Sequence, residues 1–299
     1  MAIKDLFRNY IYGKPNKRDF TEADLPENRV QLFRHVLGNR MGKMVGMNLL
    51  MLLFWLPAIA WTALILLNVV SILALPEAEL LTMFHQIMNT WLVILFPLIA
   101  IAGPFNVGAS DVFRRWAQDE HCFPMITFRA ALKANWKQGL LFGVVDGLVP
   151  LLAYLAARFY WELSVQSKVF LVPVVLALLL MLLWLLAAPL VPQLIVGYEL
   201  RFVSVLKNAL LMTLVSLPRS IAVRLVTLVV PLLGVAVMYI FPSGIGVLLF
   251  FGPLLYAAFL LSFNKLIWAS YANALGEKFL NPRIPGAPTN IGLRPNRGE

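Results

Sequence analysis

The chain has 299 residues, of which 60% are hydrophobic and 13% are charged, with a formal net charge of +10. The charged share is about half that of an average soluble domain, which excludes an ordinary water-soluble fold and requires much of the surface to face lipid. The single cysteine, Cys122, excludes an intrachain disulfide and a cysteine-based metal cluster. The three histidines are far apart in the sequence, so we expect no metal and no cofactor.

The first 44 residues are charged, and the first long apolar run begins only after them. A cleavable signal peptide has its apolar region much nearer the start. We therefore expect residues 1–44 to form a cytoplasmic segment that contains an amphipathic helix. The span that follows is expected to act as an uncleaved membrane anchor.

A transmembrane helix needs about 20 mainly apolar residues to cross the hydrocarbon. Six runs satisfy this requirement, although the first and the fourth are longer than needed and their ends stay open. The six predicted spans are 45–75, 91–107, 139–160, 169–196, 221–241 and 245–268. The fold class predicted from them is an all-α membrane bundle.

Every predicted span contains proline, which removes a helical hydrogen bond and kinks the helix unless it lies at a helix end. We expect kinked helices packed in a bundle, with prolines at helix ends as the alternative. The prolines are Pro57, Pro97, Pro104, Pro150, Pro173, Pro189, Pro192, Pro231 and Pro253.

Basic residues predict the orientation of the chain. With six spans, 23 of the 25 Lys and Arg residues fall on the side of both termini, and only Arg158 and Lys168 fall on the other. Because cytoplasmic loops carry the excess of Lys and Arg, we expect a multi-pass protein of the bacterial cytoplasmic membrane with both termini in the cytoplasm. The basic face then contacts anionic lipid headgroups, and we expect no nucleic-acid partner.

The spans divide the chain into three parts. The N-terminal segment covers 1–44, the membrane domain covers 45–268 with cytoplasmic loops at 108–138 and 197–220, and the C-terminal tail covers 269–299. The tail alternates proline and glycine after residue 280, which argues against a continuous helix. We expect a mobile extension after Ala274, with a tether that orders on a partner or on the cytoplasmic loops as the alternative.

Short amphipathic motifs precede three of the predicted membrane hairpins. They are "FRHVL" at Phe33, "FRAALK" at Phe128 and "FVSVLK" at Phe202. Each places Phe and Leu four residues apart, on one helical face. Two glycine stripes have the same spacing of four, Gly38/Gly42/Gly46 and Gly139/Gly143/Gly147, and we assign both to close helix packing.

The stretch "ASDVFRRWAQDEHCF" at 109–123 is the most charged segment between apolar runs. We expect a helix that begins after Ser110 and ends before Pro124, with alternating charges at Asp111, Arg115 and Asp119. One hypothesis is that its charged face docks a partner subunit, and the alternative is that it only anchors the loop at the interface. The candidate docking residues are Arg114, Arg115, Trp116, Asp119, Glu120 and His121.

A second helix, capped by Thr127, is expected to lie in the headgroup plane, because an apolar stripe runs beside a basic one. Its candidate interface residues are Phe128, Arg129, Lys133, Trp136 and Lys137.

Three ionisable residues fall inside predicted spans, where a charge is costly: Asp146, Arg224 and Lys265. We expect Asp146 to pair with one of the two cations, with Asn135 or Asn208 as polar neighbours. A proton or solute pathway through Asp146 is the alternative.

The run "GPFNVGASDVFRRWAQDEHCFPMITFRAALKANWKQGLL", with "GMNLLMLLFWLP" upstream and "LKNALLMTLVSLPR" downstream, resembles the YesL-like family of bacterial membrane proteins. The resemblance covers about 28–268. It implies a polytopic protein without an assigned activity whose relatives are often encoded beside carbohydrate ABC importers, and it supplies no catalytic residues.

Enzyme signatures are missing from the sequence: there is no GxxxxGK[ST], HExxH or GxSxG motif. The leading hypothesis is a non-enzymatic accessory membrane protein that associates with an ABC importer through its cytoplasmic helices. The alternatives are an autonomous small-solute transporter with a polar path at Asp146, and an intramembrane enzyme.

Overall fold

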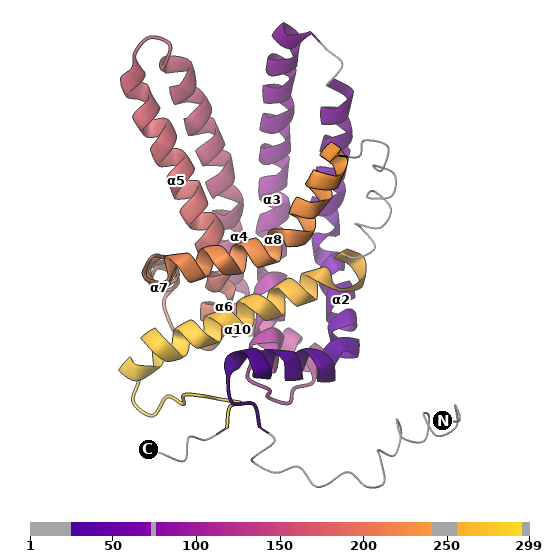
Figure 1. Ribbon diagram of the computed structural model, residues 1–299, viewed down its shortest axis with the longest axis vertical. Coiled ribbons are helices and arrows are strands. Elements are labelled where there is room, and N and C mark those ends of the chain that lie inside the picture. The colour runs from indigo at the N-terminus through magenta and orange to yellow at the C-terminus, as the bar shows by residue number, and fades with distance from the viewer. Residues whose placement is uncertain (1–24, 73–75, 241–255, 295–299) are drawn as a thin grey trace, which may run out of the picture.

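The computed structural model describes residues 25–72, 76–240 and 256–294. Within these ranges every regular element is helical and none is a strand (Figure 1). The α-helices are α2 (Arg29–Ile72), α3 (Glu77–Ala117), α4 (Pro124–Leu163), α5 (Leu171–Ala187), α6 (Leu190–Gly197), α7 (Phe202–Val215), α8 (Leu217–Ile240) and α10 (Leu261–Phe279). Three single turns complete the list, the 3₁₀ turns η2 (Lys168–Phe170) and η5 (Asn281–Arg283) and the π-helical turn η4 (Tyr256–Leu260).

Four of the described helices are long and apolar enough to cross a membrane: α2, α3, α4, and α5 together with η2. The pair α7 and α8 makes a fifth span if it is counted as one, although it bends by 97° at its break. The class of helical membrane bundle is therefore confirmed. Part of the sixth predicted span, 245–255, lies outside the described residues, and its remainder continues through α10 to Phe279.

The helices run in two directions (Figure 1). Most of α2 and the upper parts of α3, α4 and α5 run along the long axis, whereas α10, the start of α8 and the first turns of α2 lie across it. The connection between α4 and α5 lies at one end of the molecule, and the two ends of the described chain lie at the other. The buried core is centred where the transverse helices cross α3.

Prolines inside helices are tolerated here without ending them. Pro57, Pro97, Pro104 and Pro150 all lie within continuous helices. Pro189 instead lies at the break between α5 and α6, which divides the overlong fourth predicted span. The kinks expected at the intrahelical prolines stay a prediction.

One of the two glycine stripes packs as expected. A Cβ atom on Gly139, Gly143 or Gly147 would collide with the backbone of α3, so the missing side chains let α3 and α4 approach closely. No atom of the described residues lies within 4 Å of a Cβ built on Gly38, Gly42 or Gly46, so the described structure shows no packing contact at this stripe.

The charged segment is not a separate helix. Helix α3 runs without interruption through Ser110, whose hydroxyl donates to the carbonyl of Asn106 one turn earlier instead of capping a new helix. Pro124 opens α4, where a proline at the first position sacrifices no hydrogen bond. The predicted boundaries at Ser110 and Thr127 were therefore wrong.

The C-terminal segment packs against the rest of the chain as far as Arg294, so the mobile extension expected after Ala274 is also corrected. Helix α10 continues to Phe279, and the backbone N–H of Arg294 donates to the carbonyl of Pro26 at 2.8 Å. Arg294 also pairs with Glu27 at 3.1 Å. The absence of a continuous helix after residue 280 agrees with the prediction.

Candidate functional site

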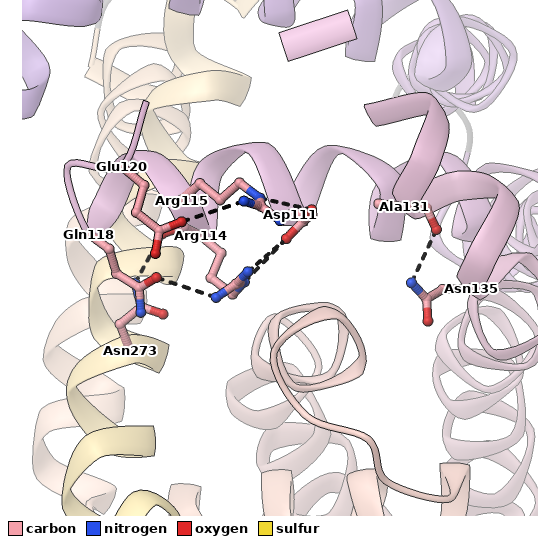
Figure 2. Close-up of polar contacts among 8 residues, drawn as sticks. All are labelled: Asp111, Arg114, Arg115, Gln118, Glu120, Ala131, Asn135 and Asn273. Carbon is pink, nitrogen blue, oxygen red and sulfur yellow. Dashed lines mark hydrogen bonds and ion pairs between the residues drawn. The ribbon is translucent and has the colours of Figure 1, made fainter. Parts of the chain in front are cut away.

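Asp111 is shared by two arginines at the end of α3 (Figure 2). Its carboxylate accepts from Arg114 Nε and Nη2 at 3.2 and 3.1 Å, and from Arg115 Nε at 3.3 Å. Arg115 also lies 3.6 Å from Glu120. The i, i+4 pairing of Asp111 with Arg115 is the part of the predicted charge pattern that the structure forms.

Asp119 does not continue that helical face. It follows the end of α3 with a φ of +56° and pairs with the buried Arg40 of α2 at 2.9 Å. His35 lies 3.5 Å from the same carboxylate. The side chain therefore ties the end of α3 to α2.

The six candidate docking residues do not share one exposed surface. Trp116 is fully buried and packs edge-on against Phe113, while Arg114 is engaged by Asp111 and by the Gln118 carboxamide oxygen. His121 is exposed, and Glu120 and Arg115 are partly exposed. The helical spacing places Trp116 in an apolar stripe with Val112, Phe113 and Ala117, and this stripe is the buried side of α3.

The candidate interface residues divide in the same way. Phe128 is buried against α3, with its ring within 3.1 Å of the Cβ position of Gly108. Arg129, Lys133, Trp136 and Lys137 are exposed along α4, and Lys137 Nζ lies 5.7 Å from the Trp136 ring. These four residues belong to a 40-residue helix rather than to a separate surface helix.

Asp146, Arg224 and Lys265 line one cavity of about 310 Å³, although they come from α4, α8 and α10. Asp146 Oδ1 accepts a hydrogen bond from Trp184 Nε1 at 3.0 Å. Among the described residues no cation lies within 4.0 Å of Asp146, so the expected direct ion pair is replaced by a shared cavity. Asn106, Trp55, Phe142 and Trp184 also line it and were not singled out from the sequence.

Each cation of this cavity has a neutral partner. Arg224 donates to the backbone carbonyl of Leu185, and its guanidinium lies 4.9 Å from the centre of the Trp268 ring. Its Nε is buried, and no described residue accepts a hydrogen bond from it. Lys265 Nζ donates to Asn106 Oδ1. The cavity therefore gathers two positive groups and one carboxylate that do not neutralise one another by contact.

The two expected asparagine neighbours lie elsewhere. Asn135 donates to the carbonyl of Ala131, as Figure 2 shows, and Asn208 donates to that of Ser204. Both bonds run back along the residue's own helix. Neither asparagine lines the cavity at Asp146.

Metal binding and nucleophilic catalysis by cysteine have little support among the described residues. No group of three His, Cys, Asp or Glu side chains in them is placed to hold a metal ion. Burial raises the pKa of the Cys122 thiol, and a hydrogen bond with Thr127 and the charges of Arg40 and Arg115 offset part of that rise. A raised pKa keeps the thiol protonated at neutral pH and makes it a poor nucleophile.

Comparison with family models, with curated proteins and with solved structures finds no match to this chain. The resemblance to the YesL-like family therefore stays a prediction from the quoted residues. The class that the fold defines is a multi-pass helical membrane protein.

Proposed function

We propose that the chain is a bacterial cytoplasmic-membrane protein with six spans and both termini in the cytoplasm, and that it binds and passes a small polar solute through the cavity at Asp146. The observation that carries the proposal is the placement of Asp146, Arg224 and Lys265 around one cavity of about 310 Å³. Charges inside a membrane domain are costly and mark solute or ion pathways.

The lining suggests the class of solute. Two positive groups and one carboxylate face the same space, and Arg224 Nε is a buried donor without a partner. A solute that carries a carboxylate would pair with Arg224 and Lys265, while an ammonium or hydroxyl group would pair with Asp146. An amino acid or a small hydroxylated acid has both features.

Polar side chains continue along α4 beyond Asp146. Tyr154, Arg158 and Glu162 follow it at intervals of eight, four and four residues, so the set spans about 24 Å and turns through about 160° around the helix. Tyr154, Arg158 and Glu162 line a second cavity of about 620 Å³ between α3, α4 and α5. There the Tyr154 hydroxyl lies 2.8 Å from His85 Nδ1.

Uptake into proteoliposomes tests the proposal. The purified chain is reconstituted and assayed with a panel of radiolabelled amino acids and small carboxylates, beside the variants Asp146→Asn and Glu162→Gln. We expect uptake of at least one compound by the wild type, a loss of about tenfold or more in Asp146→Asn, and a smaller effect in Glu162→Gln. Equal uptake by wild type and Asp146→Asn, or none above empty liposomes, would reject the pathway.

An accessory subunit is the second candidate function. The support is a group of exposed apolar residues, Phe123, Met125 and Ile126, which adjoins His121 and precedes the exposed basic residues of α4. Such a surface suits either the lipid interface or a partner subunit, and the family resemblance points to ABC importer subunits. Purification of the native complex in mild detergent tests this, since Phe123→Ser with Ile126→Ser should release any co-purifying importer subunit.

An intramembrane enzyme is the third alternative. It would need reactive side chains gathered in one cavity, and the described lining of the Asp146 cavity contains no Ser, Cys, His or Tyr beside Asp146 and Lys265 to activate either of them. We therefore place it after the two binding functions.

A further inference from the structure

A third cavity, of about 250 Å³, lies between the end of α3, helix α6, helix α10 and the C-terminal segment. It shares no lining residue with the cavity at Asp146. Its polar lining consists of Arg114, Gln118, Gln193, Tyr198, Asn273 and Asn281. This composition differs from the apolar surroundings of a packed helix junction.

Gln193 is the most informative residue of this cavity. Its side chain is 3% exposed, and both its carboxamide oxygen and its nitrogen are buried without a hydrogen-bond partner in the described structure. Buried amides almost always have partners, so an unpaired one beside a cavity needs an explanation. A ligand that accepts from the nitrogen and donates to the oxygen supplies both missing bonds.

Arg114 gives the cavity its charge. Three of its five N–H groups donate to Asp111 and Gln118, which leaves two for another acceptor. The Asp111 carboxylate is shared with Arg115, so it offsets only part of the charge of Arg114. Arg114 is the only charged side chain that lines the cavity in the described structure, which favours an anionic ligand.

The C-terminal segment forms the outer wall. The Tyr198 hydroxyl donates to Asn281 at 2.7 Å, and Asn281 donates to the carbonyl of Pro288 at 2.7 Å. Arg29 holds the far side of the wall through the carbonyl of Ile291 at 3.2 Å. A ligand in the cavity would therefore contact a segment whose attachment depends on a few polar bonds.

We propose that the juxtaposition of the Arg114 guanidinium with the unpaired Gln193 carboxamide forms a binding site for a small hydroxylated anion, a carboxylate or a phosphate ester. The anionic group binds Arg114, and a hydroxyl group both donates to and accepts from Gln193. Binding also holds the wall at 281–291 against α3 and α6. The site is independent of the proposed solute path at Asp146.

The volume limits the size of the ligand. A water molecule takes about 30 Å³ in the liquid, so the cavity has room for about eight waters or for an organic anion of about ten non-hydrogen atoms. Glycerol 3-phosphate has this size and carries both kinds of group. It is a suitable probe. Glycerol is its uncharged half, and inorganic phosphate is the half that lacks the glycerol hydroxyl groups.

Equilibrium binding to the purified full-length chain in detergent tests the proposal. We expect saturable binding of glycerol 3-phosphate, and at least tenfold weaker binding of glycerol and of inorganic phosphate. Gln193→Leu should weaken glycerol 3-phosphate binding by tenfold or more without lowering the melting temperature, because leucine removes an unpaired buried amide. Lys207→Gln, at an exposed position of α7 that lines neither this cavity nor the one at Asp146, serves as the control and should bind it as the wild type does.

Hydrogen exchange gives an independent readout. Glycerol 3-phosphate should slow amide exchange over 281–291 in the wild type and leave it unchanged in Gln193→Leu. No saturable binding by the wild type, or equal binding by Gln193→Leu, would overturn the site. Glycerol binding as tight as that of the phosphate ester would overturn its anionic character, and phosphate binding as tight would overturn the role of the hydroxyl group.

Discussion

Gly143 of α4 lies directly against Ala100 of α3, because a Cβ atom built on Gly143 would stand 2.7 Å from the Ala100 carbonyl oxygen. The obstacle is backbone, so a flexible side chain cannot move aside to relieve it. Gly139 and Gly147 meet the α3 backbone in the same way. The contact between the two longest apolar helices that follow α2 therefore depends on the absence of side chains along this stripe.

Gly143→Ala should destabilise the bundle by about 1–3 kcal/mol, because the added methyl group forces α3 and α4 apart. Gly42→Ala is the matched control, since Gly42 also lies inside a helix but no atom of the described residues comes within 4 Å of its Cβ position. That change should be neutral or stabilise by up to about 1 kcal/mol, owing to the higher helix propensity of alanine. Thermal denaturation in detergent measures both, and an equal response of the two variants would contradict the packing role of Gly143.

Asp119→Ala should destabilise the fold by about 1–3 kcal/mol, because it leaves the Arg40 guanidinium buried without its carboxylate. The φ of +56° adds strain for alanine that asparagine tolerates better. Asp119→Asn should therefore lose less stability than Asp119→Ala, and His121→Ala, at an exposed position, should lose little. Chemical denaturation measures all three, and an Asp119→Ala variant as stable as wild type would show that the pair adds nothing.

The sequence was sufficient for features that depend on composition or on spacing within one helix. The apolar runs predicted the helical membrane class, and the spacing of Asp111 and Arg115 predicted their ion pair. The two glycine stripes show that spacing within one helix does not predict which face contacts another helix. Gly42 and Gly143 occur in the same pattern, and only the position of a neighbouring helix, which the pattern does not contain, distinguishes them.

Single residues near helix ends were also compatible with more than one local structure. A proline ends one helix or begins the next, and Pro124 begins α4. A serine caps a helix or bonds back along it, and Ser110 bonds back to Asn106. The packing of the tail depends on Arg294 and Glu27, which are 267 positions apart, so no window of sequence reveals it.

The orientation of the bundle makes a direct prediction about surface labelling. The connection between α3 and α4, which contains His121, lies at the end of the molecule that holds both ends of the described chain, and the connection between α4 and α5, which contains Lys168, lies at the opposite end (Figure 1). Both variants are made in a Cys122→Ser background. Lys168→Cys should react with an impermeant maleimide in intact cells, whereas His121→Cys should react only after the cells are permeabilised. The reverse pattern would reject the cytoplasmic placement of the termini.

Gly292 holds the C-terminal segment against α3, and this contact predicts a specific loss of tail attachment. A Cβ atom on Gly292 would stand 2.6 Å from the Gln118 carbonyl oxygen, and the φ of +77° already disfavours any other residue. Gly286 has a similar φ of +73° but meets no atom within 4 Å, so Gly286→Ala carries the backbone strain without the clash.

Both alanine variants should lose about 1–2 kcal/mol of folding stability because of the left-handed backbone, but only Gly292→Ala should also detach the segment from Gln118. Limited proteolysis with trypsin measures this attachment, with cleavage expected after Arg283. We expect Gly292→Ala to be cleaved several-fold faster than Gly286→Ala, because the open form of its tail is more populated. Equal cleavage of the two variants would show that backbone strain, rather than the contact with α3, governs how the tail is held.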